Sequence, residues 1–280
     1  MNCRLQRHDV ELSYSVEGRG LPVLMIQGVS TAGCAWKPQV ETLKSEFEIL
    51  TFDNRGLGGS LPCTGPISIE SMADDARALM DKLGWENAHV VGHSMGGVIA
   101  QQLAVDHPNR VRSLSLLCTF ARGKDAARLT PWVLWMTLRT RLGTLAMRRR
   151  AFLEMLWPLE ELARLDQDAL AAKLSPLLGR DLAAQPAVAL KQLRAMARSD
   201  LSSRLSELRG VPTWVLSAQH DHIAHPRYGQ KIAELVPGAI FELMDACSHG
   251  VTLHRPDRIN DKLRRFLISV EEERGRNITT

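Results

Sequence analysis

The sequence predicts an α/β protein, in which a mostly parallel central sheet carries helices on both faces. Two observations support this fold class. Apolar runs of strand length alternate with segments of helical periodicity up to residue 119, and again from residue 211. Between them, residues 124–205 contain no apolar run typical of a buried strand. We therefore expect residues 1–123 and 206–280 to form one core domain, with 124–205 inserted as a helical cap.

The N-terminal part is expected to begin with strands. Residues 4–17 predict an antiparallel pair, because apolar and polar side chains alternate along much of this stretch. The continuous apolar run at 21–26 is typical of a strand buried on both faces. A helix is expected at 36–45. The apolar run at 47–52 predicts the next strand, which leads into a glycine-rich loop at 53–60.

Helices and strands then alternate regularly. Apolar residues recur at helical spacing over 68–83, and Gly84 follows as a stop signal. A β-branched run that ends at Gly92 predicts a strand. The helix that follows, from Met95, is expected to end near His107, before a strand at 111–119.

The insertion and the C-terminal part follow the same reasoning. Thr130-Pro131 is typical of a helix start within the insertion. Strands are predicted at 211–218 and 239–244, with a helix at 228–236 between them. A closing helix is predicted from apolar residues spaced over 259–270, and the polar tail at 271–280 is expected to fray.

The bulk composition is typical of a folded protein of a reducing compartment. The 280 residues suffice for one large domain with an insertion. The first residues do not resemble a secretory signal, and no apolar run is long enough to span a bilayer. The five cysteines are scattered and form no C-x-x-C pair, so we interpret them as reduced thiols. We expect a cytoplasmic protein without stable membrane insertion.

The net charge of +4 is concentrated in one segment. Between Arg122 and Arg150 there are eight cations and one anion, so the rest of the chain is net negative. Such a run is commonly a solvated helix face. The alternative is that it attracts an anionic substrate or a membrane surface. Because the segment lacks the aromatic pattern of nucleic-acid modules, no nucleic-acid partner is expected.

The stretch Gly92–Gly96, with sequence G-H-S-M-G, predicts a nucleophile. It matches G-x-S-x-G, in which a serine lies on a sharp turn between a strand and a helix. The two glycines permit the close backbone approach that such a turn requires. The Ser94 hydroxyl would then stand clear of the sheet edge, where a substrate can reach it, beside the Met95 N–H at a helix N-terminus. A glycine-flanked turn with a capping serine is the alternative interpretation.

Two later loops supply the partners that a nucleophilic serine needs. A serine hydroxyl is activated when a histidine, itself held by a carboxylate, takes its proton. Asp221 follows the strand predicted at 211–218, and His249 follows the strand predicted at 239–244. Because the carboxyl ends of parallel strands meet at one edge of a sheet, Ser94, Asp221 and His249 form the predicted catalytic triad.

Four motifs together resemble the α/β-hydrolase fold over nearly the whole chain. Besides the Gly92–Gly96 turn, residues 53–60 match the D-x-R-G-x-G-x-S loop of the esterase, enol-lactonase and cofactor-free haloperoxidase-like branches. Residues 218–226 are similar to the family's acid loop, with Asp221 in the acid position. Residues 248–250 resemble its catalytic histidine loop.

The resemblance implies a carboxylic ester hydrolase of carboxylesterase or lactonase type. Its small-molecule ester or lactone substrate would form an acyl-enzyme on Ser94, with no cofactor and no metal. The family's His-Gly oxyanion loop stands here as Gln27-Gly28. The resemblance still implies that the N–H groups of Val29 and Met95 form the oxyanion hole, because a backbone donor does not depend on the replaced side chain. Nothing in the sequence explains Cys247, where the family often has glycine.

Two other classes of protein remain open at this point. A cofactor-free haloperoxidase or perhydrolase shares the same triad, so the motif cannot separate it from an esterase. A ligand-binding receptor could keep the hydrolase pocket with little turnover. Epoxide hydrolases and dehalogenases are disfavoured, because those relatives use an aspartate nucleophile where this chain has Ser94.

Four residues are predicted to contact the substrate: Ser30, close to the oxyanion loop, and Trp132, Trp135 and Met136 in the insertion. Aromatic and methionine side chains in an insertion can line an apolar pocket. The alternative is that they pack against the core domain.

Further polar residues near these motifs are assigned supporting roles. The histidines at 220, 222 and 225 do not have a recognised metal-ligand spacing, so no metal site is predicted. His93 is expected to pack beside the turn rather than act as a base. Asp245 is the alternative acid, because it lies close to His249 in the sequence. Asp53 and Arg55 are expected to brace their loop electrostatically.

Overall fold

The computed structural model describes residues 3–126 and 131–278, which contain one eight-stranded sheet. The strands lie in the order β1-β2-β4-β3-β5-β6-β7-β8. β1 and β2 are antiparallel to their neighbours, and all pairs from β4 to β8 are parallel. The strand bounds are β1 Cys3–Gln6, β2 Glu11–Gly18, β3 Leu21–Ile26, β4 Phe47–Phe52, β5 Ala88–His93, β6 Val111–Leu117, β7 Thr213–Ala218 and β8 Ile240–Met244.

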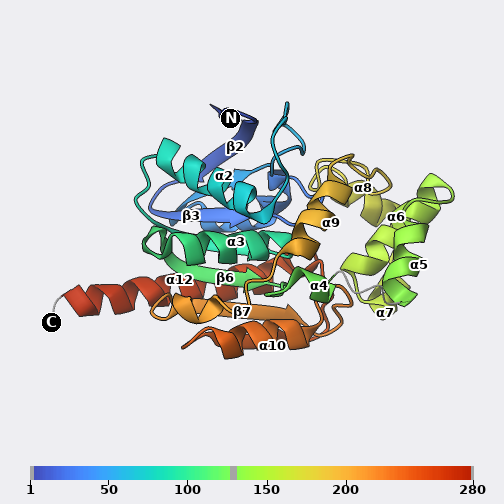
Figure 1. The fold of residues 1–280 in the computed structure, drawn as a ribbon. Helices are drawn as coiled ribbons and strands as arrows, with labels where there is room; N and C mark the ends of the chain where they lie inside the picture. The colour runs from blue at the N-terminus through green and yellow to red at the C-terminus, as the bar shows by residue number, and fades with distance from the viewer. Residues whose placement is uncertain (1–2, 127–130, 279–280) are drawn as a thin grey trace.

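Helices flank both faces of this sheet, as predicted for the fold class (Figure 1). Helix α2 packs against α3, and α1 packs against α12. The core helices are α1 Lys37–Leu43, α2 Ile69–Lys82, α3 Met95–Asp106, α10 Pro226–Leu235, α11 Val251–His254 and α12 Pro256–Ile278. None of the helices in the described ranges is long and apolar enough to cross a membrane.

The C-terminal helix differs from the sequence prediction. We expected the polar tail from residue 271 to fray, but α12 continues as helix to Ile278 (Figure 1). Glu271 explains part of this extension, because its carboxylate lies 2.7 Å from the Arg112 guanidinium on β6. This ion pair connects the C-terminal half of the helix to the sheet, and the polar residues beyond it continue the same helix.

Between β6 and β7 the described chain is helical and contains no further strand. These helices are α4 Gly123–Ala126, α5 Pro131–Arg139, α6 Leu145–Leu156, α7 Leu159–Leu162, α8 Gln167–Leu174 and α9 Ala189–Arg198. Helices α5 to α8 lie together at the right in Figure 1, with α9 between them and the sheet. Part of this region has its own hydrophobic cluster, centred on buried residues of α6, α7 and α8. We therefore propose that 124–205 is a cap domain; Arg128 and Thr130 lie outside the described residues.

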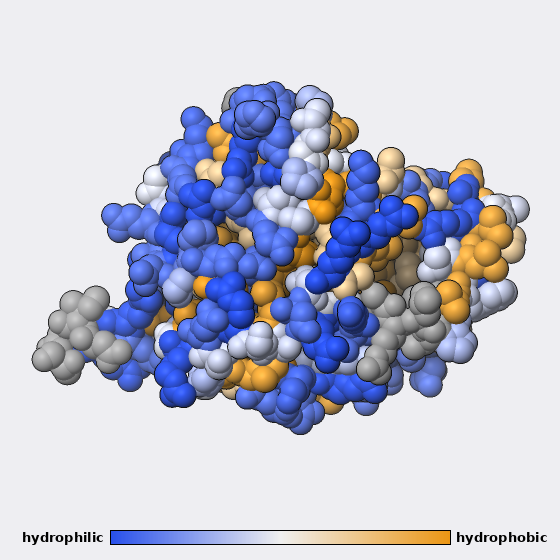
Figure 2. Space-filling view, in the orientation of Figure 1, coloured by the Kyte–Doolittle hydropathy of each residue, from blue (hydrophilic) through white to orange (hydrophobic). Residues whose placement is uncertain are grey.

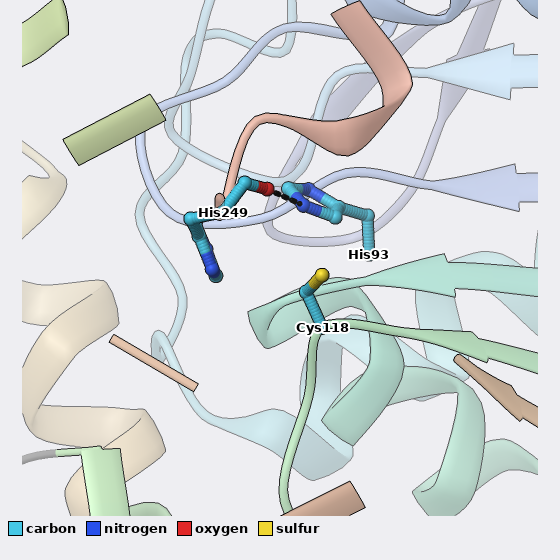
Figure 3. Close-up of side chains that lie close together, drawn as sticks. All are labelled: His93, Cys118 and His249. Atoms are coloured by element: carbon cyan, nitrogen blue, oxygen red, sulfur yellow. Dashed lines mark hydrogen bonds between the residues drawn. The ribbon is translucent and has the colours of Figure 1, made fainter. Parts of the chain in front are cut away.

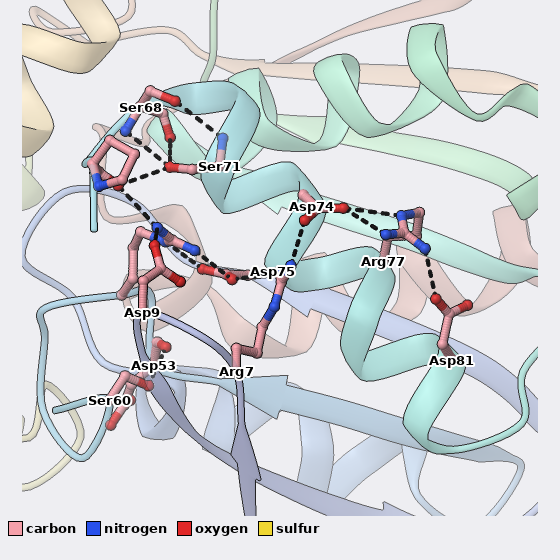
Figure 4. Close-up of polar contacts among 12 residues, drawn as sticks. Arg7, Asp9, Asp53, Ser60, Ser68, Ser71, Asp74, Asp75, Arg77 and Asp81 are labelled. Atoms are coloured by element: carbon pink, nitrogen blue, oxygen red, sulfur yellow. Dashed lines mark hydrogen bonds and ion pairs between the residues drawn. The ribbon is translucent and has the colours of Figure 1, made fainter. Parts of the chain in front are cut away.

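The loop at 53–60 is held by an extensive polar network (Figure 4). The Arg55 guanidinium donates to both carboxylate oxygens of Asp75, at 2.6 and 2.8 Å, and to Asp9 at 2.9 Å. Arg55 and Asp75 are almost completely buried. The Asp53 carboxylate accepts from the backbone N–H groups of Gly33 and Gly59. Both residues therefore brace the loop, and neither lines the cavity that contains Ser94.

The sheet topology determines where polar loops can gather. Because β3, β5, β7 and β8 are parallel, the residues that follow them emerge at one edge of the sheet. These residues include the turn at Ser94 and the loops that carry Asp221 and His249. Three segments far apart in the chain are thus placed side by side.

Candidate active site

Ser94 lies on a strained turn between β5 and α3. Its backbone has φ 56° and ψ −124°, a left-handed conformation that non-glycine residues rarely adopt. The turn is tight because a Cβ on Gly92 would lie 2.4 Å from the Gly96 carbonyl oxygen. A Cβ on Gly96 would lie 2.1 Å from the Ile26 carbonyl oxygen. Any side chain at position 92 or 96 would therefore clash with the backbone. The turn presents the serine hydroxyl to the cavity beneath the cap.

The three residues predicted as a triad form a continuous hydrogen-bonded chain. His249 Nε2 lies 2.9 Å from Ser94 Oγ, and His249 Nδ1 lies 2.7 Å from Asp221 Oδ2. All three are buried. An ionised carboxylate can only accept, so His249 Nδ1–H donates to Asp221 and Nε2 accepts from the Ser94 hydroxyl. In this tautomer the imidazole can remove the Ser94 proton.

Asp221 is held in its ionised form by the groups around it. Burial alone would raise the pKa of this carboxyl group. The neighbouring His249 and two backbone donors outweigh that effect and hold the pKa below its usual value. The donors are the N–H groups of Ile223 and Ala224, each 2.8 Å from Asp221 Oδ1. One carboxylate oxygen is thus fixed by the backbone, which leaves the other for His249.

Two backbone donors lie where an oxyanion would form. Met95 begins α3, so its N–H has no acceptor inside the helix. Val29 follows β3 in the loop whose Gly28 packs against the Ser94 side chain, so closely that a Cβ on Gly28 would lie only 2.9 Å from Ser94 Cβ. Within the described chain neither N–H has a hydrogen-bond partner. We propose these two groups as the oxyanion hole.

His93 packs behind the turn and contacts His249. Its ring is buried, and Nε2 lies 2.9 Å from the His249 backbone oxygen, to which it donates when neutral. Its ring lies 5.0 Å from that of His249 and meets Trp36 edge-on. Burial, followed by the nearby His249, lowers the pKa of His93 to about 3. His93 therefore stays neutral and positions the loop that carries His249.

Cys118 completes a potential metal-binding cluster with the two histidines (Figure 3). The ligand atoms of His93, Cys118 and His249 lie within 4.8 Å of one another. Both ring nitrogens of His249 are already engaged by Ser94 and Asp221. Burial raises the pKa of the Cys118 thiol well above its usual value, and the Asp221 carboxylate raises it further, so the sulfur is protonated. A metal here would break the triad, so we assign these residues to its support.

The neutral state of His93 predicts a dependence of stability on pH. In the folded state its pKa is depressed, so between pH 6.5 and about 3 the unfolded chain binds the extra proton. The contribution of neutral His93 to the free energy of unfolding is therefore fully present above pH 6.5 and is lost as the pH falls. Between pH 7 and 5 we expect a contribution of about 2 kcal/mol to the loss of unfolding free energy.

Urea unfolding of the wild type and His93→Gln at pH 7 and pH 5 measures this contribution. Glutamine does not titrate and can still donate to the His249 backbone oxygen. The variant should lose about 2 kcal/mol less than the wild type over this interval. Equal losses in the two proteins would show that His93 is not held neutral.

The cavity at Ser94 has a volume of about 390 Å³ and lies between the core and the cap. Ser94 and His249 form its base, and Val29 and Ser30 form part of its wall. Its other lining residues are mostly apolar: Phe120, Trp132, Met136, Phe152, Met155, Leu156, Leu190, Leu193, Met196 and Ile223. Three of the four residues predicted to contact substrate are thus in this lining.

Trp135 is the fourth, and the structure places it elsewhere. It does not line the cavity; its side chain is 57% exposed and lies beside Arg139. Trp132 and Met136 are four residues apart and share one face of α5, whereas Trp135, directly before Met136, is rotated from it by about 100° around the helix axis. Figure 2 shows hydrophobic residues at the outer side of the cap, where other exposed apolar residues of this segment include Leu134, Leu138, Leu142, Leu145 and Met147.

The other candidates named from the sequence lie outside the triad. His222 stacks on Trp132 with ring centroids 5.1 Å apart, and the His225 ring accepts from the Arg227 N–H at the start of α10. Neither belongs to the cluster of potential metal ligands found among the described residues. Asp245 is an exposed partner of Arg258 and makes no contact with His249.

Much of the basic segment at 122–150 is neutralised locally. Arg139 pairs with Glu154, Arg149 with Asp181 and Arg150 with Asp168. Arg141 differs, because it reaches the cavity lining. The sequence did not identify Arg180, which also lines the cavity and lies outside this segment. No motif surrounds Arg180, so only its position in the fold reveals it.

The fold and the site define an enzyme-like protein in which a strained serine, a histidine and an aspartate meet at the carboxyl edge of a parallel sheet. The chain belongs to the alpha/beta hydrolase fold family, whose model matches residues 22–256.

Individual relatives have several different names. The chain is 29% identical to RutD of Azorhizobium caulinodans, which is named as a carbamate hydrolase; the match covers 94% of this chain and 97% of the relative. Among solved structures, a thermophilic esterase from Thermogutta terrifontis is 27% identical, with a TM-score of 0.79 and coverage of 96% and 99%. The enol-lactonase from Burkholderia xenovorans is 25% identical, with a TM-score of 0.74 and coverage of 92% and 97%. These relatives share the fold and the hydrolase class, but their names indicate different substrates.

Proposed function

We propose that this protein hydrolyses a carboxylic ester or a lactone through an acyl-enzyme on Ser94. The observation that carries the proposal is the hydrogen-bonded chain from Ser94 Oγ through His249 to Asp221. The apolar cavity above Ser94 also supports it, because a small organic substrate would be shielded there from water. Relatives named as an esterase and an enol-lactonase agree with this chemistry.

The geometry supports a two-step reaction. His249 Nε2 takes the Ser94 proton as Oγ attacks the carbonyl carbon, and the N–H groups of Val29 and Met95 stabilise the oxyanion. The alcohol leaves with the proton from His249. Water then attacks the acyl-enzyme with His249 as the base, and the carboxylic acid is released. Asp221 stabilises the imidazolium that forms in each step.

Two related activities use the same groups. A perhydrolase would accept hydrogen peroxide in place of water at the acyl-enzyme. A carbamate hydrolase would attack a carbonyl that carries nitrogen. Carbamates should be assayed as well, because several relatives are named for that activity. A low-turnover receptor would bind the same ligands without releasing product.

A substrate panel separates these activities. We expect hydrolysis of p-nitrophenyl acyl esters or simple lactones, with carbamate esters and peroxide-plus-acetate halogenation assayed beside them. Faster turnover of carbamates than of matched esters would replace our proposal with carbamate hydrolysis. Dye halogenation faster than ester hydrolysis would favour the perhydrolase. Binding with single turnover only would favour the receptor.

A further inference from the structure

Ser30, Arg180 and Gln192 carry buried polar groups without partners, and the first two of these residues line the cavity. Ser30 and Gln192 are 4% and 0% exposed. Ser30 Oγ, Gln192 Nε2 and Arg180 Nη2 have no hydrogen-bond partner among the described residues. Buried polar atoms are nearly always paired, because each unpaired group loses its hydration without compensation. Three unpaired groups in one place therefore need an explanation.

The three groups belong to one connected structure. Gln192 Oε1 on α9 accepts from the Ser30 N–H at 2.9 Å, and Arg180 Nε donates to the Ser30 carbonyl oxygen at 3.0 Å. Ser30 itself has φ 59°, so its backbone is held in a strained conformation by these contacts. Ser30 and Arg180 both line the cavity. Ser30 and Arg180 thus bring an unpaired hydroxyl and an unpaired guanidinium nitrogen to the same cavity, and Gln192 holds the Ser30 backbone from α9.

Arg180 is a cation without a carboxylate hydrogen-bond partner in the part of the chain that the structure describes. Its Nη1 donates to the backbone carbonyl oxygens of Asp181, Leu182 and Ala184, and its guanidinium lies 4.9 Å from the Phe152 ring centroid. These contacts orient the side chain. The neighbouring Asp181 carboxylate acts on Arg180 electrostatically, but its hydrogen bonds go to Arg149. Burial lowers the pKa of Arg180, and the opposing effect of the Asp181 carboxylate does not outweigh it. An anion bound here would stabilise the charged guanidinium and offset the hydration that Arg180 has lost.

The charges of the other lining residues also favour an anionic ligand. Among the described lining residues there are two arginines, Arg141 and Arg180, and no aspartate or glutamate. Most other lining residues are apolar, so a charge in the cavity is poorly screened and interacts strongly with Arg180. A planar guanidinium with free N–H groups matches the geometry of a carboxylate.

We propose that Arg180 and Ser30, with Gln192 holding the Ser30 backbone in place, form a subsite for a carboxylate, and that the substrate is a short ester or lactone that carries a free carboxylate. This inference rests on the proposed function at Ser94. Ser30 directly follows Val29, the proposed oxyanion donor, so only a short carbon chain can separate the carboxylate from the reacting carbonyl. Hydrolysis of such a substrate releases a small dicarboxylic acid from an ester, or a hydroxy or oxo dicarboxylic acid from a lactone.

A matched pair of esters tests the subsite. Monoethyl glutarate carries a free carboxylate, and ethyl 5-oxohexanoate has a methyl ketone in its place. We expect kcat/KM of the wild type to be at least tenfold higher for the acid ester. In Arg180→Gln that preference should disappear, and Arg180→Lys, which keeps the charge, should restore part of it. Arg150→Gln removes the same charge from the outer cap and should leave the preference unchanged.

A second variant with a smaller change tests the subsite even if Arg180→Gln does not fold. Ser30→Ala removes only the unpaired hydroxyl, and we expect it to lower the preference several-fold. Thermal unfolding of each variant identifies loss of the fold. A preference that is retained in both Arg180→Gln and Ser30→Ala, or that falls equally in Arg150→Gln, would overturn the subsite. High salt should leave the wild-type preference largely intact, because a buried pair is weakly screened.

Calorimetric binding of glutarate separates this inference from the proposed function. Binding that is lost in Arg180→Gln supports the subsite even if both esters and the p-nitrophenyl ester and lactone panel are inert, in which case the ester hydrolase proposal fails. Equal hydrolysis of both esters without Arg180-dependent glutarate binding leaves the hydrolase proposal standing and overturns the subsite. If glutarate does not bind, and both esters and the panel of p-nitrophenyl esters and lactones are inert, both proposals fail.

Discussion

Replacement of Ser94 with alanine is expected to lower kcat for the best ester or lactone by a factor on the order of 10⁴ to 10⁶. The reason is that no other hydroxyl shares a hydrogen bond with His249 Nε2 in the described structure. Both serine and alanine carry a Cβ, so the substitution leaves the strained φ of 56° in place and should not change the turn. Initial rates under saturating substrate measure the effect.

The Ser94→Ala protein should still bind substrate and product. Its oxyanion donors and cavity wall are unchanged, so product inhibition constants should stay within a few-fold of the wild type. Retention of more than a hundredth of the wild-type kcat would remove Ser94 from the role of nucleophile. Circular dichroism and thermal unfolding of the variant supply the control for folding.

Replacement of Asp221 with asparagine is expected to lower kcat about 10⁴-fold. The two backbone N–H groups from Ile223 and Ala224 require an acceptor at the Oδ1 position, so they fix which way the new amide lies. Its NH2 group then faces His249 Nδ1, which must become an acceptor. The His249 proton moves to Nε2, and this tautomer cannot take the proton of Ser94.

Asp245→Asn provides the matched control for this prediction. Asp245 lies close to His249 in the sequence, but its carboxylate pairs with Arg258 at the surface. We expect its kcat to match that of the wild type. A large loss of kcat in Asp245→Asn, with near-normal activity in Asp221→Asn, would exchange the roles of the two acids.

The placement of the triad could be predicted because it depends on local patterns and one topological rule. The turn at Ser94 is specified by glycines at 92 and 96, each of which is needed to avoid a backbone clash. Asp221 and His249 follow strands whose apolar runs are evident in the sequence. In a parallel sheet those strand ends share an edge, so the residues had to meet. The mostly parallel sheet could be predicted for the same reason.

The cap and its contribution to the cavity could not be predicted in this way. Its helices are short, and which face each turns to the cavity depends on packing between them. Trp132 and Trp135 are similar in sequence terms, yet only Trp132 lines the cavity. Arg180 lies far in sequence from Ser30, and its role depends on a contact that no periodicity encodes. The charge run at 122–150 was visible, but the carboxylates that neutralise much of it became evident only in the fold.

The central claim is that Ser94 is an activated nucleophile, and covalent labelling tests it without knowledge of the substrate. A fluorophosphonate probe should add once to the wild-type protein, and peptide mass spectrometry should place the adduct on Ser94. Asp221→Asn should be labelled much more slowly, and Ser94→Ala not at all. No adduct on the folded wild-type protein, or an adduct on another residue that persists in Ser94→Ala, would contradict the account.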